Sequence, residues 1–214
     1  LSDTDISGKI NNVDLTVKAD IALSQSGQHQ QGKLFIDFNH SELTLEAKDS
    51  TVWDINGQLS VDNINHWHHD VNGAFTSTFS ISGEKNNPVI TLSSNVTKLN
   101  WQHLHSTFLT VETRYQPMSN HQIQFTFHND RLSWFSDNNT FSIDDFDLTL
   151  KGSANKHQIK ATWLGDSTGQ LSLTGHWDET FTYWKSSVEK STLTYLNAAI
   201  KNDTIFGLDF DLAK

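Results

Sequence analysis

The stretch "NHWHHDVNG" (65–73) gathers the side chains in this sequence that are best suited to chemistry. His66, His68 and His69 lie within four positions of one another, and Asp70 follows them directly. Imidazole and carboxylate groups are the ligands that a zinc site uses in a chain without cysteine. The stretch could therefore be a metal site, a catalytic cluster or the polar end of a β-strand.

Two histidine pairs have the spacing of a two-ligand clamp, because alternate residues of a strand share one face. They are His66 with His68 and His103 with His105. A zinc site needs three or four ligands held by supporting hydrogen bonds. Most of the 11 histidines fall in turns or at strand ends. We therefore interpret them as ordinary polar residues and predict no metal ligands.

Carboxylates and nucleophiles offer no better catalytic motif. The acids of "DDFD" (144–147) or the pair Asp62 and Asp70 could imitate the two carboxyls of a glycosidase, but nothing in the sequence indicates a cleft between them. "DDFD" also lacks the ligand spacing of a calcium loop. No G-x-S-x-G elbow or phosphate-binding glycine loop occurs. We predict solvated acids beside strands, no catalytic residues and no cofactor.

Charge and hydropathy exclude further classes of function. The formal net charge is −10, and the 15 Lys and Arg residues are scattered. Nucleic acid is therefore not expected as a ligand, because phosphate binding needs a clustered basic surface. No apolar run exceeds three residues, so no segment is expected to span a bilayer as a helix. The chain starts at Leu1 without a signal-peptide pattern, and we interpret it as a segment of a longer protein.

The elements that position these residues are predicted from period-two alternation of apolar and polar residues. In "VDLTVKADIAL" (13–23) the apolar residues occupy one face, and Thr16 and Lys18 lie on the other. The same alternation recurs in most of the chain between turn segments such as "GEKNNP" and "GSANKH". A short helix is conceivable only in "SSVEKSTLTYLNAAIK" (186–201), where a strand is favoured. The fold class is therefore all-β, an antiparallel meander with one apolar face.

The alternation also favours a strand end followed by a turn for the histidine stretch. If the strand continues straight, Trp67 is in step with Val61 and Val71. "GQLSVDNINHW" parallels "GQLSLTGHW" further along, so His66 is predicted as the strand-end partner of Trp67. Residues 68–70 are then predicted to form the turn into the next strand.

The last third of the chain carries a motif that resembles a block found in the TamB family of AsmA-like periplasmic bridge proteins. In that block a strand ending in Gly precedes a His-containing strand, and "g-x-L-x-L-x-G-x-W" and Trp-containing strands follow. The matching positions here are Gly152, His157, Leu171, Leu173, Gly175, Trp177, Trp184 and Val188. Because no interior linker is visible, we expect residues 1–214 to form one continuous β segment of a larger TamB-like protein.

The resemblance implies a location, partners and a shape. Members of the family are anchored in the inner membrane of Gram-negative bacteria by a helix that would lie outside this segment, and they extend through the periplasm. They pair with an outer-membrane barrel protein of the TamA type and support outer-membrane assembly, including autotransporter insertion and phospholipid transport. Their sheet is curled into an open, taco-shaped groove with an apolar interior.

The leading hypothesis is a non-enzymatic segment whose apolar groove shields phospholipid acyl chains or unfolded outer-membrane proteins. The residues predicted to line the groove are Val13, Leu15, Val17, Ile55, Leu59, Phe75, Phe79, Phe125, Phe127, Leu148, Leu150, Leu171, Leu173 and Phe210. The alternative is a carbohydrate-binding or adhesin-like β-sandwich, which requires a closed two-sheet core and exposed Trp platforms. Against it, alternation places Trp53, Trp163 and Trp177 on the apolar face. A metallohydrolase is a more distant alternative.

Overall fold

The computed structural model describes residues 2–10, 13–22, 30–49, 51–119, 121–136, 139–178, 180, 182–195, 198–202 and 204–211. The described chain consists of fifteen strands and one short 3₁₀ helix. These elements are β1 (Ser2–Ile10), β2 (Val13–Ala22), β3 (Gln30–Phe38), β4 (Ser41–Asp49), β5 (Val52–Val61), η1 (Ile64–His66), β6 (Val71–Glu84), β7 (Val89–Trp101), β8 (Leu104–Gln116), β9 (Gln122–Ser136), β10 (Asn139–Ser153), β11 (Lys156–Gly165), β12 (Ser167–Trp177), β13 (Tyr183–Tyr195), β14 (Ala198–Asn202) and β15 (Phe206–Asp211).

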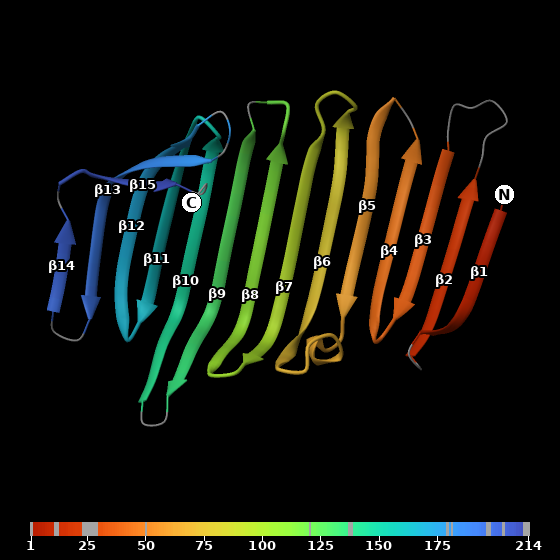
Figure 1. Cartoon of the computed structure of the whole chain (residues 1–214), viewed down its shortest axis with the longest axis horizontal. Coiled ribbons are helices and arrows are strands. Elements are labelled where there is room, and N and C mark those ends of the chain that lie inside the picture. The colour runs from red at the N-terminus through yellow and green to blue at the C-terminus, as the bar shows by residue number, and fades with distance from the viewer. Residues whose placement is uncertain are drawn as a thin grey trace.

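All fifteen strands belong to one antiparallel sheet, and β1 to β14 follow one another in chain order (Figure 1). β15 departs from this order, because it pairs with the first half of β13 while β14 pairs with the second half. The predicted all-β meander is confirmed, and the segment that could have been a helix forms β13 and β14. The described residues contain no second sheet, which the β-sandwich alternative required.

The tight connections follow from local residue chemistry. Asn39 and His40 join β3 to β4 with φ angles of 52° and 59°. Two consecutive residues in this left-handed region are typical of the two-residue turns that match strand twist, and Asn tolerates that region better than most residues. A short turn of this kind fixes the register of the hairpin, so that Phe38 pairs with Ser41.

The register gathers the apolar residues of successive strands into rows that cross the sheet. One row passes through Ile6, Val17, Ile36, Leu43, Leu59, Ser77, Ser94, Val111, Phe127, Leu148, Ala161 and Leu171. The next passes through Ala19, Leu34, Leu45, Gly57, Phe79, Leu92, Thr113, Phe125, Leu150, Ile159, Leu173 and Val188. Residues between these positions form polar rows on the opposite face.

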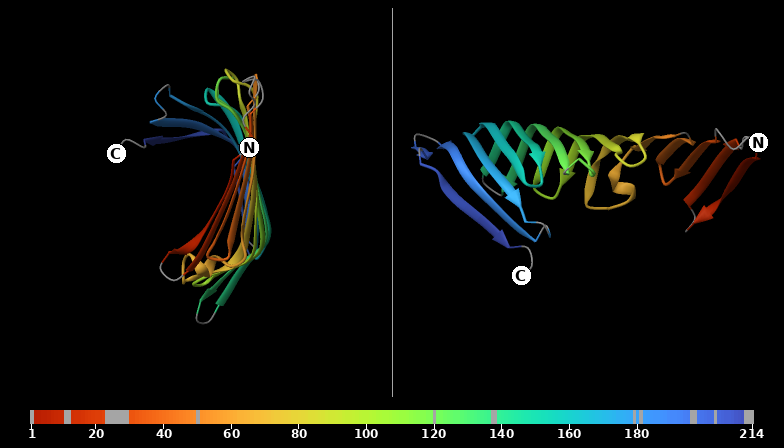
Figure 2. Two further views of the ribbon diagram at one scale, coloured as in Figure 1. Left: turned by 90° about the vertical axis from the view of Figure 1, so that its right-hand side faces the viewer. Right: turned by 90° about the horizontal axis from the view of Figure 1, so that it is seen from above.

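The sheet is curled, and its apolar rows lie on the concave side. Figure 2 shows the strands bent along their length, with β13–β15 turned over one side. Curvature crowds side chains on the concave face and separates those on the convex face. Ala161, Leu173 and Val188 in the apolar rows are buried, whereas no residue is buried in the polar rows through Thr126 and His128. The fold is therefore an open trough with an apolar interior.

Candidate functional site: the apolar trough

The concave face, called the trough below, carries the apolar rows of the sheet. The register places nine of the groove residues predicted from the sequence in the two apolar rows, and Val13, Leu15, Ile55, Phe75 and Phe210 lie in neighbouring rows. Most are half-buried, although Leu173 is only 6% exposed and Phe210 is 51% exposed. Since no second layer covers them, their outer surfaces remain available to a ligand. Contact between these residues and a cargo stays a prediction.

Polar side chains interrupt the trough at a few places, and two pairs of them bond across neighbouring strands. The hydroxyls of Ser77 and Ser94 lie 2.8 Å apart and are buried. The amide of Asn129 donates to Ser106 Oγ at 2.5 Å, and both residues are buried. A buried hydroxyl with a partner has little to gain from a polar ligand. The interior therefore presents apolar surface to whatever lies in it.

The residues of the sequence motif converge at the C-terminal end of the trough. Trp184 Nε1 donates to His157 Nε2 at 2.7 Å, and His157 Nδ1 donates to the carbonyl oxygen of Ser153 at 3.1 Å. Gly175 lies beneath both rings, because a Cβ there would come within 2.7 Å of Trp184 and 2.8 Å of His157. Val188 on the adjoining strand is 1% exposed. We call these residues the ring cluster, and it packs the trough where β13 turns over.

The turn that leads into β13 is fixed by one carboxylate. The hydroxyl of Thr180 and the backbone N–H groups of Thr182 and Tyr183 all donate to Asp178. These bonds favour the ionised carboxylate and lower its pKa to about 2, with the Thr180 hydroxyl contributing most. The Asp178 carboxylate therefore stays ionised at physiological pH and keeps these hydrogen bonds. They fix the backbone of Tyr183, the residue next to Trp184.

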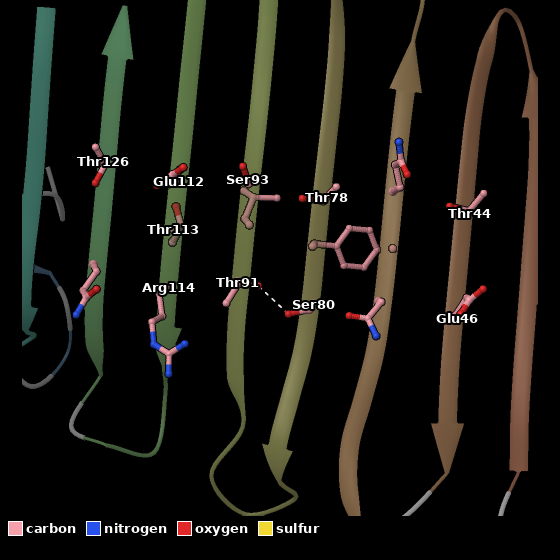
Figure 3. Close-up of a pocket in the computed structure, with 16 residues that line it drawn as sticks. Thr44, Glu46, Thr78, Ser80, Thr91, Ser93, Glu112, Thr113, Arg114 and Thr126 are labelled. Atoms are coloured by element: carbon pink, nitrogen blue, oxygen red, sulfur yellow. Dashed lines mark hydrogen bonds between the residues drawn. The ribbon is translucent and has the colours of Figure 1, made fainter.

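The outer, polar face contains a shallow hollow of about 720 Å³ over β4–β9 (Figure 3). Thr78, Ser93 and Glu112 lie in one polar row across it, and the hydroxyls of Ser80 and Thr91 bond at 2.7 Å in the next. Most side chains around the hollow carry hydroxyl, amide or charged groups, and Phe79 and Leu92 also line it. A surface of this composition stays hydrated, so it serves solubility and contrasts with the trough on the other side.

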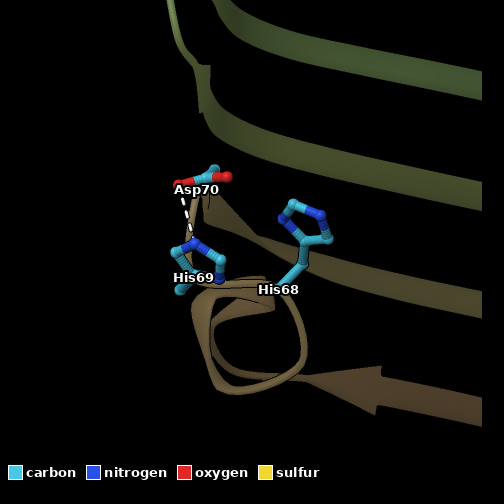
Figure 4. Close-up of side chains that lie close together, drawn as sticks. All are labelled: His68, His69 and Asp70. Carbon is cyan, nitrogen blue, oxygen red and sulfur yellow. Dashed lines mark ion pairs between the residues drawn. The ribbon is translucent and has the colours of Figure 1, made fainter.

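The histidine stretch follows β5 without continuing it as a strand (Figure 4). η1 intervenes, His66 stacks on His40 at 4.2 Å, and Trp67 Nε1 donates to Ser41 Oγ at 2.7 Å. The prediction that Trp67 stays in step with Val61 on one strand is therefore wrong. The 3₁₀ turn, capped by the side chain of Asn63, redirects the chain.

The side chains of His68, His69 and Asp70 come close enough to share a cation, with ligand atoms within 4.8 Å of one another. All three are exposed, and His69 Nε2 lies 3.1 Å from Asp70 Oδ1. The predicted role of residues 68–70 as a turn agrees with their place before β6. The expectation that this stretch holds no metal stays a prediction.

Sequence reasoning missed a cluster around His128 in the middle of β9. His128 Nδ1 lies 2.9 Å from Asp147 Oδ1, and Nε2 lies 3.0 Å from Asp130 Oδ1. The hydrogen bond to Asp147 is the main cause of a raised His128 pKa, and Asp130 adds to it. The antiparallel pairing of "FTFHND" with "DDFDLTL" could have revealed this contact, because it sets His128 opposite Asp147. Asp145 and Asp147 are thus paired acids inside a strand, not residues flanking one.

A family comparison decides what kind of protein carries this trough. The family model described as "TamB, N-terminal domain" matches residues 1–214. The chain belongs to the TamB family. Neither a curated protein nor a solved structure matches the chain.

TamB proteins are transport and assembly components of outer-membrane biogenesis that span the periplasm from an inner-membrane anchor, with TamA-type partners. Among the described residues, no helix has the length and apolarity that crossing a membrane requires. Four of the eight motif positions recognised in the sequence, His157, Gly175, Trp184 and Val188, form the ring cluster of the structure.

Proposed function

We propose that this segment shields phospholipid acyl chains in its trough, as one stretch of a TamB-like bridge through the periplasm. The observation that carries the proposal is the set of mainly apolar rows on one face, which are half-exposed and have no covering layer among the described residues. Soluble proteins rarely expose so much contiguous apolar surface unless it binds something. Each methylene removed from water contributes about 0.8 kcal/mol, so one acyl chain gains several kcal/mol without a specific contact.

An unfolded outer-membrane protein is the second candidate cargo, and hydrogen bonding disfavours it inside the trough. The backbone groups of the trough strands bond to their neighbours in the sheet. A protein strand lying on this face would leave its own N–H and C=O groups without partners in an apolar environment, which costs several kcal/mol per group. An acyl chain carries no such groups. Strand addition would instead need an open sheet edge.

A pair of neighbouring substitutions in β10 tests the proposal. Leu148→Asp places a carboxylate in the trough between Phe127 and Ala161, whereas Thr149→Asp places it on the outer face opposite Lys160. We expect Leu148→Asp to lose most of the phospholipid that purifies with the chain, because a buried carboxylate is costly to cover with an acyl chain. Thr149→Asp should retain it.

Circular dichroism of both variants controls for folding, and Leu148→Gln provides a milder change at the same position. Lipid is extracted from each purified protein and quantified by mass spectrometry. Equal lipid content in folded Leu148→Asp, Leu148→Gln and Thr149→Asp proteins would contradict the proposal.

A further inference from the structure

The two long rims of the trough differ in their exposed side chains. The rim at the bottom of Figure 1, where β5 leads to η1 and β7 leads to β8, exposes aromatic rings. Trp101 is 48% exposed and Trp134 is 51% exposed. We call this rim the aromatic lip; its exposed aromatic residues are Trp67, Trp101, Trp134, Phe135 and Phe141. At the opposite rim, Val52, Trp53 and Met118 are exposed between the end of β4 and the start of β9, and Phe206 and Phe210 are exposed on β15 beside the first half of β13.

The aromatic lip continues the trough surface. Trp101, Leu104, Trp134 and Phe141 are register partners in one row across β7–β10. Ser106 lies two residues after Leu104 on β8, toward the middle of the sheet. Its hydroxyl accepts a hydrogen bond from Asn129, which belongs to the trough. Residues two apart on a strand share a face. The aromatic row therefore extends the apolar interior to the edge of the sheet, where it meets water.

Charge also distinguishes the lip from the opposite rim. Asp62, Asp70 and Asp166 lie at the strand ends that form the lip, Lys98 lies three residues before Trp101, and Arg131 is paired with Asp144 at 3.2 Å. Near the opposite rim, Lys85, Lys151, Lys156 and Lys185 lie among Asp49, Glu84 and Asp178, and the Lys85 ammonium sits 6.0 Å from the ring centroid of Trp53. Among the described residues, no Lys or Arg lies over Trp101 or Trp134.

We propose that the aromatic lip binds the headgroup and glycerol region of a phospholipid whose headgroup carries an ammonium group, while its acyl chains lie in the trough. This inference rests on the proposed function and adds the orientation and class of the lipid. Indole rings favour the boundary between apolar and polar surroundings. Their open faces attract cations, and the surrounding carboxylates attract an ammonium group and repel an anionic lipid.

Two positional isomers of one photoreactive phosphatidylethanolamine test the orientation. One carries a diazirine near the glycerol and the other carries it at the terminal carbon of the acyl chain. We expect the glycerol-proximal isomer to label residues 101–104, 132–136 and 139–141, and the terminal isomer to label Phe125, Phe127 or Leu148. Labelled peptides are identified by mass spectrometry of the 214-residue chain.

The outcomes separate the two proposals. If the terminal isomer labels the trough but the glycerol-proximal isomer labels the region of Trp53 and Met118 as strongly as the lip, the lip proposal is wrong and the acyl-chain proposal stands. If neither isomer labels the trough or the lip, both are wrong.

The headgroup class is tested with vesicles of equal phosphatidylethanolamine and phosphatidylglycerol content. We expect the chain to retain the ethanolamine lipid preferentially, and Trp101→Leu or Trp134→Leu to lower that preference about two- to fivefold, the size of an exposed cation–π contact. Trp53→Leu on the opposite rim is the matched control and should leave it unchanged. No preference in the unmodified chain, or an equal loss in Trp53→Leu, would overturn the assignment.

Discussion

Gly175 is the residue on which the packing of the ring cluster depends most directly. A side chain at this position would meet Trp184 Nε1 at 2.7 Å and His157 Nε2 at 2.8 Å, whereas at Gly207 on β15 the nearest atom would be 3.7 Å away. We expect Gly175→Ala to lower the free energy of unfolding by about 1–3 kcal/mol, because the rings must move apart. Urea denaturation followed by Trp fluorescence measures the loss. Gly207→Ala is the control, and an equal effect of both substitutions would contradict the packing described.

His128 makes stability depend on pH at the level of a single side chain. Its pKa is raised in the folded chain, mainly by Asp147. A raised pKa means that the stabilisation is complete below the unfolded-state value of about 6.5 and is lost as pH rises through the folded-state value. The imidazole is about one-third exposed, so we expect less than about 1 kcal/mol.

The measurement for His128 is the difference in unfolding free energy between the unmodified chain and His128→Gln. We expect this difference to be larger at about pH 5.5 than at about pH 8.5, because the interaction with Asp147 favours the charged imidazole. Taking the difference between the two proteins removes contributions that do not involve His128. If the difference in unfolding free energy instead increased with pH, the charged form of His128 would not be the stabilising one, and the account would be contradicted.

At the scale of elements, the buried serine pair tests how β6 and β7 are joined. Ser77 and Ser94 are register partners in an apolar row, and each hydroxyl is satisfied by the other. Ser94→Ala leaves the Ser77 hydroxyl buried without this partner, and we expect it to cost about 1–3 kcal/mol. The double variant Ser77→Ala/Ser94→Ala should cost less than the sum of the single variants. Additive losses in a double-mutant cycle would argue against the hydrogen bond.

Alternation in the sequence predicts which face of each strand is apolar, and it does so correctly for β2, β9 and β10. It does not predict where that face ends. Lys98 and Arg131 adopt φ angles of 52° and 47° inside strands, and the pairing of β6 with β7 shifts between Asn72 and Ala74. Lys and Arg are not residue types that predict a positive φ angle, so the sequence does not indicate these irregular positions. The aromatic lip, which lies beyond these irregular positions, was therefore invisible to strand parity.

Contacts between strands were predictable only where the register could be inferred. The motif residues His157, Gly175 and Trp184 were recognised as a set, but their convergence depends on how β11, β12 and β13 pair. The same applies to His128 and Asp147, which are distant in sequence. The composition of each strand is local information, whereas register is set by turns and bulges elsewhere.

At the scale of the whole molecule, the open trough leaves apolar surface in contact with water, and the proposed lipid would cover it. Binding to the folded state alone raises stability by mass action. We therefore expect the delipidated chain to bind a hydrophobic dye such as ANS more strongly and to unfold at a lower temperature than the chain purified with lipid. Calorimetry before and after readdition of phospholipid vesicles measures the shift. An identical transition in both preparations would show that lipid does not occupy the folded sheet.

The central claim is that one face of a single sheet holds cargo and the other does not. A photoreactive amino acid placed in turn at each position from Ile123 to Phe127 of β9 tests this directly, since Ile123, Phe125 and Phe127 belong to the trough rows and Gln124 and Thr126 belong to the outer rows. The proposal predicts lipid capture at alternate positions, with 123, 125 and 127 labelled and 124 and 126 unlabelled. Equal capture from both faces would contradict it.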